Sequence, residues 1–183
     1  MSTDQSIYKD LSEYLSSRFE KDEAIEMVHE SQLYDVMMDM ALSNDKTLGW
    51  RATWILANCM DKGTDWLIPR LPEVIQALHT ITKDGHIREL LKFFRDIDFK
   101  DYPEEHQSEL FDLCLDILKN NKIQAGTRSN ALQIMLKFAE VEPFLIGEIR
   151  AAYEMVKTYL SGGIRHSCEK RINRLELEII NQE

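Results

Sequence analysis

Four arginines that each follow a glycine recur at nearly even spacing along the chain. Arg51, Arg88, Arg128 and Arg165 stand 37, 40 and 37 residues apart, in the contexts GWR, GHIR, GTR and GIR. A guanidinium is a planar fork of donors that binds carboxylates and phosphates bidentately. The row can therefore be a ladder of cations for an anionic ligand, or a set of ion pairs with acids of the neighbouring repeat. Recurrence at each repeat favours ion pairs, because a single binding site does not need four copies.

The most basic segment is SGGIRHSCEKRINR, residues 161–174. A glycine pair that precedes a helix can offer backbone N–H groups to an anion. We therefore take Arg128, Arg165, Arg171 and Arg174 as the candidate binding residues. Arg171 and Arg174 come late in the final helix, where we expect them to hold no junction between repeats. The alternative is a loop followed by a solvated closing helix.

The residue types that carry catalysis or bind metals are scattered. The five histidines form no HxxxH pair, and side chains as close in sequence as His166 and Cys168 splay apart on a helix. Cys59 and Cys114 stand among apolar residues and are predicted to be core, whereas Cys168 would be reactive only if exposed. We expect no catalytic residues, no metal and no cofactor.

The charge is negative overall and unevenly distributed. The formal net charge is −10, with ten acids against three Lys/Arg in residues 1–44, and nine Lys/Arg against five acids in residues 121–174. A field of this sign repels nucleic acid and anionic membranes. We expect a monomer with an unknown protein partner, and an acidic segment of that partner is the candidate contact. The polar N-terminus, the absence of a long apolar run and the three dispersed cysteines predict a cytoplasmic protein.

Apolar residues recur at steps of three and four, which predicts helices throughout. Ile7, Leu11, Leu15 and Phe19 form one stripe, and another runs from Leu33 to Ala41 after a break near Ser31. Further helices are predicted at about 46–60, 65–81, 85–97, 103–119, 126–140, 142–160 and 163–181. The polar connectors between them are short, so successive helices should be antiparallel neighbours.

A proline follows each of the first three repeat arginines. Pro69, Pro103 and Pro143 stand 18, 15 and 15 residues after the arginine of their repeat. Proline is tolerated in the first turn of a helix, where its missing N–H has no partner to lose. Each unit is therefore predicted to be glycine, arginine, helix, loop, proline and helix, and a period near 40 with two helices is typical of an α-solenoid.

The segments WRATWILAN, GHIRELLKFF, GTRSNALQIM and GGIRHSCEKRI resemble a family of small bacterial HEAT-like (armadillo-type) repeat proteins, over about residues 20–175. The resemblance implies an all-α, right-handed α-α superhelix of about four helical hairpins plus a closing helix, which we expect to form a single domain over residues 1–183. Stacked hairpins present an extended concave surface, and the sequence shows no nucleophile with a base and an orienting group, so we expect a non-catalytic protein-binding or adaptor module.

Two enzymatic alternatives come with this resemblance. Some members are labelled adenylosuccinate lyase, but the SSxMPxKxN loop typical of such lyases is absent, and the SS at residues 16–17 is followed by RFEKD. HEAT-like DNA glycosylases, which act on alkylated DNA, use aromatic groups in a groove. Trp50 and Trp54 lie one helical turn apart and Trp66 follows, but we expect the three rings to pack between neighbouring hairpins.

Overall fold

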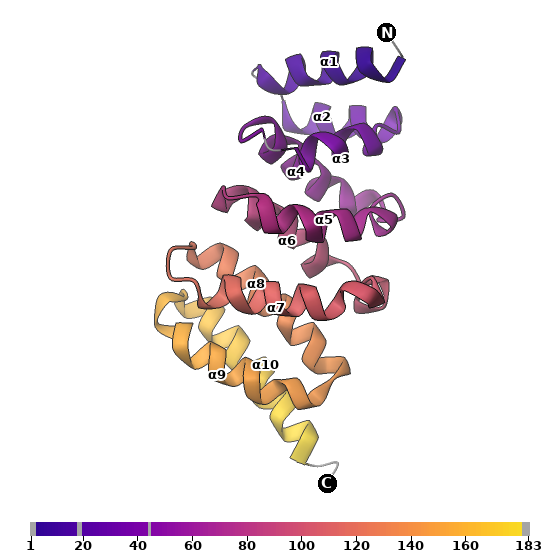
Figure 1. The fold of residues 1–183 in the computed structure, drawn as a ribbon. Coiled ribbons are helices and arrows are strands. Elements are labelled where there is room, and N and C mark those ends of the chain that lie inside the picture. Colours follow the sequence, from indigo (N-terminus) through magenta and orange to yellow (C-terminus); the bar gives the residue numbers. More distant parts are fainter. Residues whose placement is uncertain (1–2, 18–19, 44, 181–183) are drawn as a thin grey trace. The chain divides into compact units, whose positions relative to one another are not determined.

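The computed structural model describes residues 3–17, 20–43 and 45–180. Phe19, the last member of the first predicted stripe, lies outside these residues. The described residues form ten α-helices joined by short turns and contain no strand (Figure 1). The prediction of an all-α fold is confirmed. The α-helices are α1 (Thr3–Ser16), α2 (Lys21–Glu30), α3 (Tyr34–Ala41), α4 (Leu48–Cys59), α5 (Leu71–Thr80), α6 (Asp84–Asp96), α7 (Gln107–Lys119), α8 (Ala125–Val141), α9 (Ile146–Val156) and α10 (Gly162–Ile180).

The chain divides into two compact units, which we call unit 1 (Met1–Phe93) and unit 2 (Phe94–Glu183). The boundary falls inside α6, near its C-terminal end. The consecutive pairs α2–α3 and α4–α5 of unit 1 and α8–α9 of unit 2 correspond to predicted hairpins, and α10 is the closing helix. The break predicted near Ser31 is also confirmed, because Ser31 is the C-cap of α2.

The prolines shorten the second helix of each hairpin relative to the prediction. Pro69 lies within a 3₁₀ turn, η2 (Ile68–Arg70), Pro143 opens another, η5 (Pro143–Leu145), and Pro103 precedes a third. The α-helical geometry begins only after these turns. As a result, α5, α7 and α9 begin four to six residues later than the periodicity of apolar residues predicts.

The core of unit 1 joins its helices through aromatic rings. Tyr34 of α3 stacks on Trp66 at 4.8 Å between centroids, and Trp66 meets the edge of Phe93 of α6 at 6.3 Å. The indole N–H of Trp66 donates a hydrogen bond to the carbonyl of Gly63 over 2.8 Å. The polar end of the ring is thus satisfied while its faces pack. The prediction that Trp66 packs between helices is confirmed.

The core of unit 2 is built around Phe138 of α8. Its ring contacts Phe99 at 5.0 Å, Phe111 of α7 at 5.5 Å and Tyr102 at 5.7 Å between centroids. The Tyr102 hydroxyl donates to the carbonyl of Phe94, so this buried phenol is also satisfied. The cluster fixes α8 against α7 and thereby positions the N-terminal end of α8.

Two long cationic side chains cap the ends of earlier helices. Arg51 donates to the carbonyls of Leu15 and Ser17 at the C-terminal end of α1. Lys137 donates to the carbonyls of Phe94 and Ile97 at the end of α6. The last carbonyls of a helix lack intrahelical partners and carry partial negative charge, so cations are favourable there. Desolvation of the Lys137 ammonium lowers its pKa.

Candidate binding site

The loop from α7 to α8 and the turn from α9 to α10 lie on the same edge of unit 2 (Figure 1). We call this region the basic edge and define it by residues 119–128 and 157–165. Arg128 is the fourth residue of α8, and Arg165 is the fourth residue of α10. Two of the four predicted binding residues therefore stand at equivalent positions of neighbouring helices.

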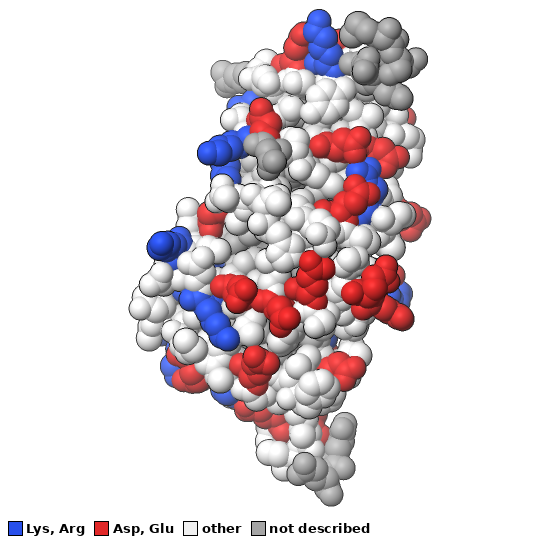
Figure 2. All heavy atoms as spheres, in the orientation of Figure 1, with Lys and Arg blue, Asp and Glu red and all other residues white. Residues whose placement is uncertain are grey.

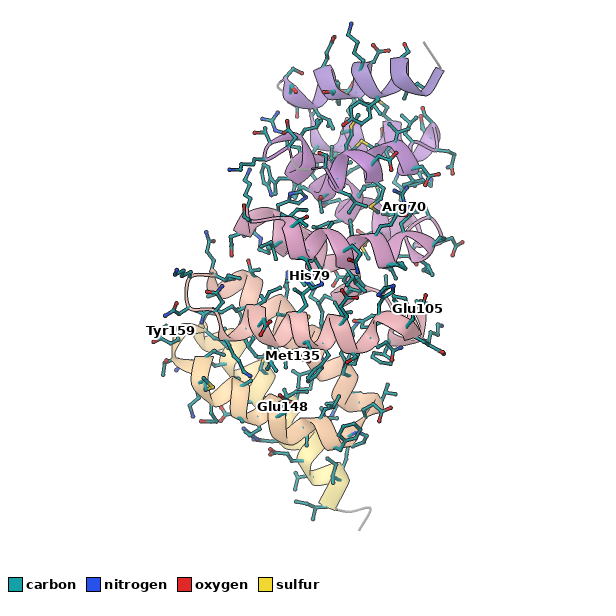
Figure 3. The ribbon with its side chains drawn as sticks, in the orientation of Figure 1. Arg70, His79, Glu105, Met135, Glu148 and Tyr159 are labelled. Atoms are coloured by element: carbon teal, nitrogen blue, oxygen red, sulfur yellow. The ribbon has the colours of Figure 1, made fainter. Side chains whose placement is uncertain are left out.

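Arg128 is buried and has an unusual set of neighbours. Only 4% of its surface is exposed, and its buried Nε has no hydrogen-bond acceptor among the described residues. The guanidinium carbon lies over the ring of Tyr159, 5.2 Å from the centroid. Tyr159 ends a 3₁₀ turn, η6 (Lys157–Tyr159), and is 61% exposed at the basic edge (Figure 3). The described residues offer this guanidinium a cation–π contact and no carboxylate.

Arg165 is exposed and forms no ion pair with the described residues. Its carbonyl accepts a hydrogen bond from the Tyr153 hydroxyl over 3.2 Å, which ties the start of α10 to α9. Its side chain lines an open depression of about 310 Å³ beside the turn. The other lining residues are Tyr153, Lys157, Gly162, His166 and Glu169.

Arg171 and Arg174 differ from the first two candidates because both reach the same carboxylate. Arg171 Nη2 lies 2.9 Å from Glu140 Oε2, and Arg174 Nη2 lies 3.0 Å from Glu140 Oε1. Glu140 belongs to α8, so the two arginines join α10 to α8. The expectation that they hold no junction between repeats is wrong, because the C-terminal end of α8 brings an acid beside them.

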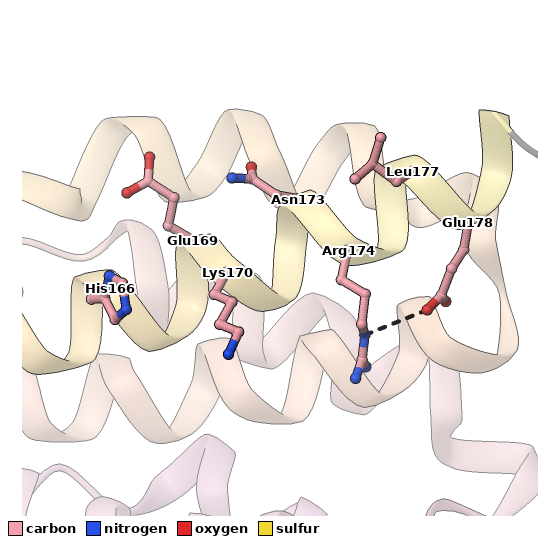
Figure 4. A pocket seen from close by; sticks show the side chains of 7 residues that line it. All are labelled: His166, Glu169, Lys170, Asn173, Arg174, Leu177 and Glu178. Atoms are coloured by element: carbon pink, nitrogen blue, oxygen red, sulfur yellow. Dashed lines mark ion pairs between the residues drawn. The ribbon is translucent and has the colours of Figure 1, made fainter.

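A groove of about 530 Å³ runs along the exposed side of α10 (Figure 4). It is lined by His166, Glu169, Lys170, Asn173, Arg174, Leu177 and Glu178. All seven residues come from α10, and Arg174 pairs with Glu178 across one turn at 3.5 Å. Because a single helix supplies the lining and both signs of charge alternate along it, the groove is an open helix face without a charge preference.

The prediction that each repeat arginine pairs with an acid of a neighbouring repeat is wrong for Arg128 and Arg165. Arg88 lies 3.2 Å from Glu89 of its own helix, a carboxylate that is 1% exposed and also binds Lys92 at 2.5 Å. Glu89 is therefore a buried acid held by two cations. Arg51, described above, does reach an earlier helix, but its acceptors there are carbonyl oxygens.

Two arginines outside the repeated pattern join helices through carboxylates. Arg70 lies within 3.2 Å of Asp35 and Asp39 of α3 and bonds Glu73 three residues on (Figure 3). The Arg70–Glu73 spacing is the one signal in the sequence that marks this cluster.

Arg150 of α9 holds α10 in the same way. Its Nη2 lies 2.6 Å from Glu176 Oε2 of α10. This hydrogen bond keeps the pKa of Glu176 below its ordinary value. The two residues are 26 positions apart, and no local pattern in the sequence connects them.

The cysteines are buried and free of disulfides. Burial raises the pKa of the Cys59 thiol to about 11 and also raises the pKa values of Cys114 and Cys168. Cys168 is 4% exposed, so its basic neighbours do not make it a reactive thiolate. Among the described residues, no group of three His, Cys, Asp or Glu side chains is arranged to hold a metal ion. No helix in this part of the chain has the length and hydropathy needed to cross a bilayer.

The two tryptophans of α4 line a cavity of about 270 Å³ together with Lys21 and Arg51. Lys21 Nζ lies 5.6 Å from the centroid of the Trp54 ring, and Lys83 Nζ lies 4.9 Å from that of Trp50. Each ring is therefore already engaged by a lysine, and no acid of the described residues lines the cavity. Activity on alkylated DNA stays a prediction to be tested.

Comparison with known proteins identifies the family. A family model described as "HEAT repeat domain" matches residues 11–175, which is most of the chain. No curated protein and no solved structure matches the chain significantly. The matched range includes α2 to α9, the four repeat arginines and most of α10. The chain is a member of the HEAT repeat domain family.

Proposed function

We propose that the protein is a non-catalytic HEAT-type scaffold that binds an acidic segment of a partner protein at the basic edge of unit 2. HEAT repeats are helical scaffolds that often mediate protein interaction, and stacked hairpins present an extended surface for such partners. The observation that carries the proposal is the pairing state of the cations. In the described residues, the arginines that join helices have acceptors, whereas those of the basic edge do not.

Three exposed cations of the basic edge, Lys119, Lys122 and Arg165, form no ion pair with the described residues. A fourth cation of the edge, Lys157, pairs with Glu154 at 2.5 Å. In contrast, Arg171 and Arg174 share Glu140, so they add less net positive charge to this end of the unit. Lysine and arginine side chains lie along this edge, while acidic side chains cover the middle of the α7 and α9 surface (Figure 2). An acidic segment is therefore attracted to the edge and repelled from the adjoining face.

Charge reversal tests the proposal. The double variant Lys122→Glu/Arg165→Glu should lose a partner that the wild-type chain captures, because like charges then face each other at the contact. Lys62→Glu is the matched control, since Lys62 is an exposed lysine of unit 1 with no ion pair among the described residues. Capture is measured by affinity purification with mass spectrometry at low and high salt. A partner retained equally by both variants would place the contact elsewhere.

Arg128, Arg171 and Arg174 remain in the proposed contact region with different roles. Arg171 and Arg174 act through Glu140, so reversing them disturbs the packing of α10 on α8 as well as the surface charge. They are therefore poor probes of partner binding, and Arg165 is the better one.

A further inference from the structure

The strongest unexplained feature of the molecule is the guanidinium of Arg128. Its residue is 96% buried, its Nε has no acceptor, and its described neighbour is the Tyr159 ring. Buried charges are otherwise paired or hydrogen-bonded, because desolvation penalises an uncompensated ion. In this protein the buried Glu89 follows that rule, with two cations beside it. Arg128 departs from it.

The position of Arg128 in α8 adds the positive end of the helix dipole to the unpaired charge of its guanidinium. The N-terminal end of a helix is the positive end of its dipole, and Arg128 stands in the first turns of a 17-residue helix. Gln124 provides no side-chain cap, and the first turn contains no acid. Residues 117–139 contain four Lys/Arg and no Asp or Glu. The segment thus gathers positive charge at one point without supplying its own anion.

We propose that Arg128 is the anchor of a carboxylate-binding site, and that its ligand is an Asp or Glu side chain of the acidic segment. The inference rests on the proposed function and names the residue that takes the ligand. The Tyr159 ring lies beside the guanidinium, and the Nε–H of Arg128 has no acceptor among the described residues, so the planar group still has a donor for a carboxylate. Tyr159 is exposed, so the acidic side chain enters beside its ring.

The surroundings fit a short acidic segment better than an isolated ion. Arg165 lines the depression of about 310 Å³ next to η6, and the start of α10 is open there, since no atom lies within 4 Å of a side chain built on Gly162. A chain that places one carboxylate on Arg128 can therefore continue over Arg165. Glu169 also lines this depression, and its charge disfavours a long acidic run there.

The test uses the full chain and two probes, a fluorescein-labelled peptide of alternating glutamate and glycine, and sodium glutarate at matched ionic strength. The side-chain Nε–H signal of Arg128 is assigned by NMR from its absence in Arg128→Met. Both probes should shift this signal in the wild-type protein. In fluorescence anisotropy, Arg128→Met should weaken the peptide by about tenfold or more, as expected for loss of a charge-assisted bidentate contact. Lys62→Gln, at the exposed lysine of unit 1 used above, is the control and should bind as the wild type does.

The outcomes separate this inference from the proposed function. Peptide binding that is unchanged in Arg128→Met, or that leaves the Arg128 signal unmoved, overturns the Arg128 site but leaves the scaffold proposal standing. If glutarate shifts the Arg128 signal but the peptide does not bind, Arg128 binds carboxylates and the inference that its ligand is an acidic protein segment is wrong. A signal moved by inorganic phosphate and by neither carboxylate overturns the ligand class. The shift is read on the wild-type protein, and the Nε–H signals of the other arginines, unchanged in Arg128→Met, show that the variant used for the assignment is folded.

Discussion

Replacing Arg128 by methionine should stabilise the protein. Methionine is unbranched and occupies roughly the volume of the arginine stem, so the apolar contacts of the stem are kept. The change removes a guanidinium that is 4% exposed and whose buried Nε has no acceptor. The unsatisfied donors of this buried charged group lower the free energy of unfolding of the wild type by about 2–3 kcal/mol. The contact with Tyr159, which the variant loses, raises it by about 1 kcal/mol. The free energy of unfolding should rise by about 1–2 kcal/mol.

The assay is thermal and urea unfolding in a buffer without carboxylates or phosphate. For a chain of this size, a change of about 1–2 kcal/mol corresponds to roughly 2–8 °C in the melting temperature. Added glutarate should raise the melting temperature of the wild type and not that of Arg128→Met, since a ligand stabilises only the folded state that binds it.

The matched control is Arg150→Met, the same substitution at a paired guanidinium. The Arg150 side chain is 24% exposed and bonds Glu176, which is 34% exposed. Its removal leaves a half-buried carboxylate without its partner and should cost about 1 kcal/mol after allowance for solvent screening. The two variants should therefore move in opposite directions. If Arg128→Met melts below the wild type by as much as Arg150→Met, the guanidinium is satisfied in the folded protein and the carboxylate site loses its basis.

Three further predictions concern other parts of the molecule. Burial lowers the pKa of His86 from 6.5, so the unfolded chain takes up a proton at a higher pH than the folded protein does. The free energy of unfolding should therefore fall as the pH drops below about 6.5. Urea unfolding between about pH 7 and 5 should show a weaker dependence on pH for His86→Gln. Lys137→Met leaves the carbonyls of Phe94 and Ile97 without their cation, which should cost about 1–2 kcal/mol and speed amide hydrogen exchange at the end of α6; unchanged exchange would contradict the capping role. Incubation with alkylated DNA should release no 3-methyladenine, and release that depends on Trp54 would establish the enzymatic alternative instead.

The helices were predictable because their signals are local. The range predicted for the first helix of the third repeat, 126–140, differs from α8 by one residue at each end, since apolar spacing and the glycine mark both limits. The starts of α5, α7 and α9 were predicted too early. A proline is compatible with both an α-helical first turn and a 3₁₀ turn, and the packing of the hairpin decides between them.

The pairing of charges was not predictable from the same signals. Arg150 and Glu176 are 26 residues apart, and Arg70 and Asp35 are 35 apart. Many acids stand at comparable distances along the chain, and only the stacking of helices selects among them. The repeat pattern marks four arginines, whereas the arginines that join helices through carboxylates stand outside the repeat. Periodicity in the sequence marks equivalent positions, but it does not require those positions to have equivalent partners.

The absence of acids from residues 117–139 is the signal that points to Arg128, and it is visible in the sequence. An arginine used to join helices needs an acceptor, and the acceptors seen in the described residues are carboxylates or side-chain amides of other helices and carbonyls at helix ends. Arg128 lies at the beginning of α8, where the backbone groups without intrahelical partners are N–H donors. Its own helix therefore has no free carbonyl there that could accept from Arg128, as the carbonyls at the end of α1 accept from Arg51. With no acid in the local sequence and no carboxylate among the described neighbours, a structural role would leave its charge uncompensated. A binding role gives the same residue an acceptor, at the point where α8 and α10 both begin.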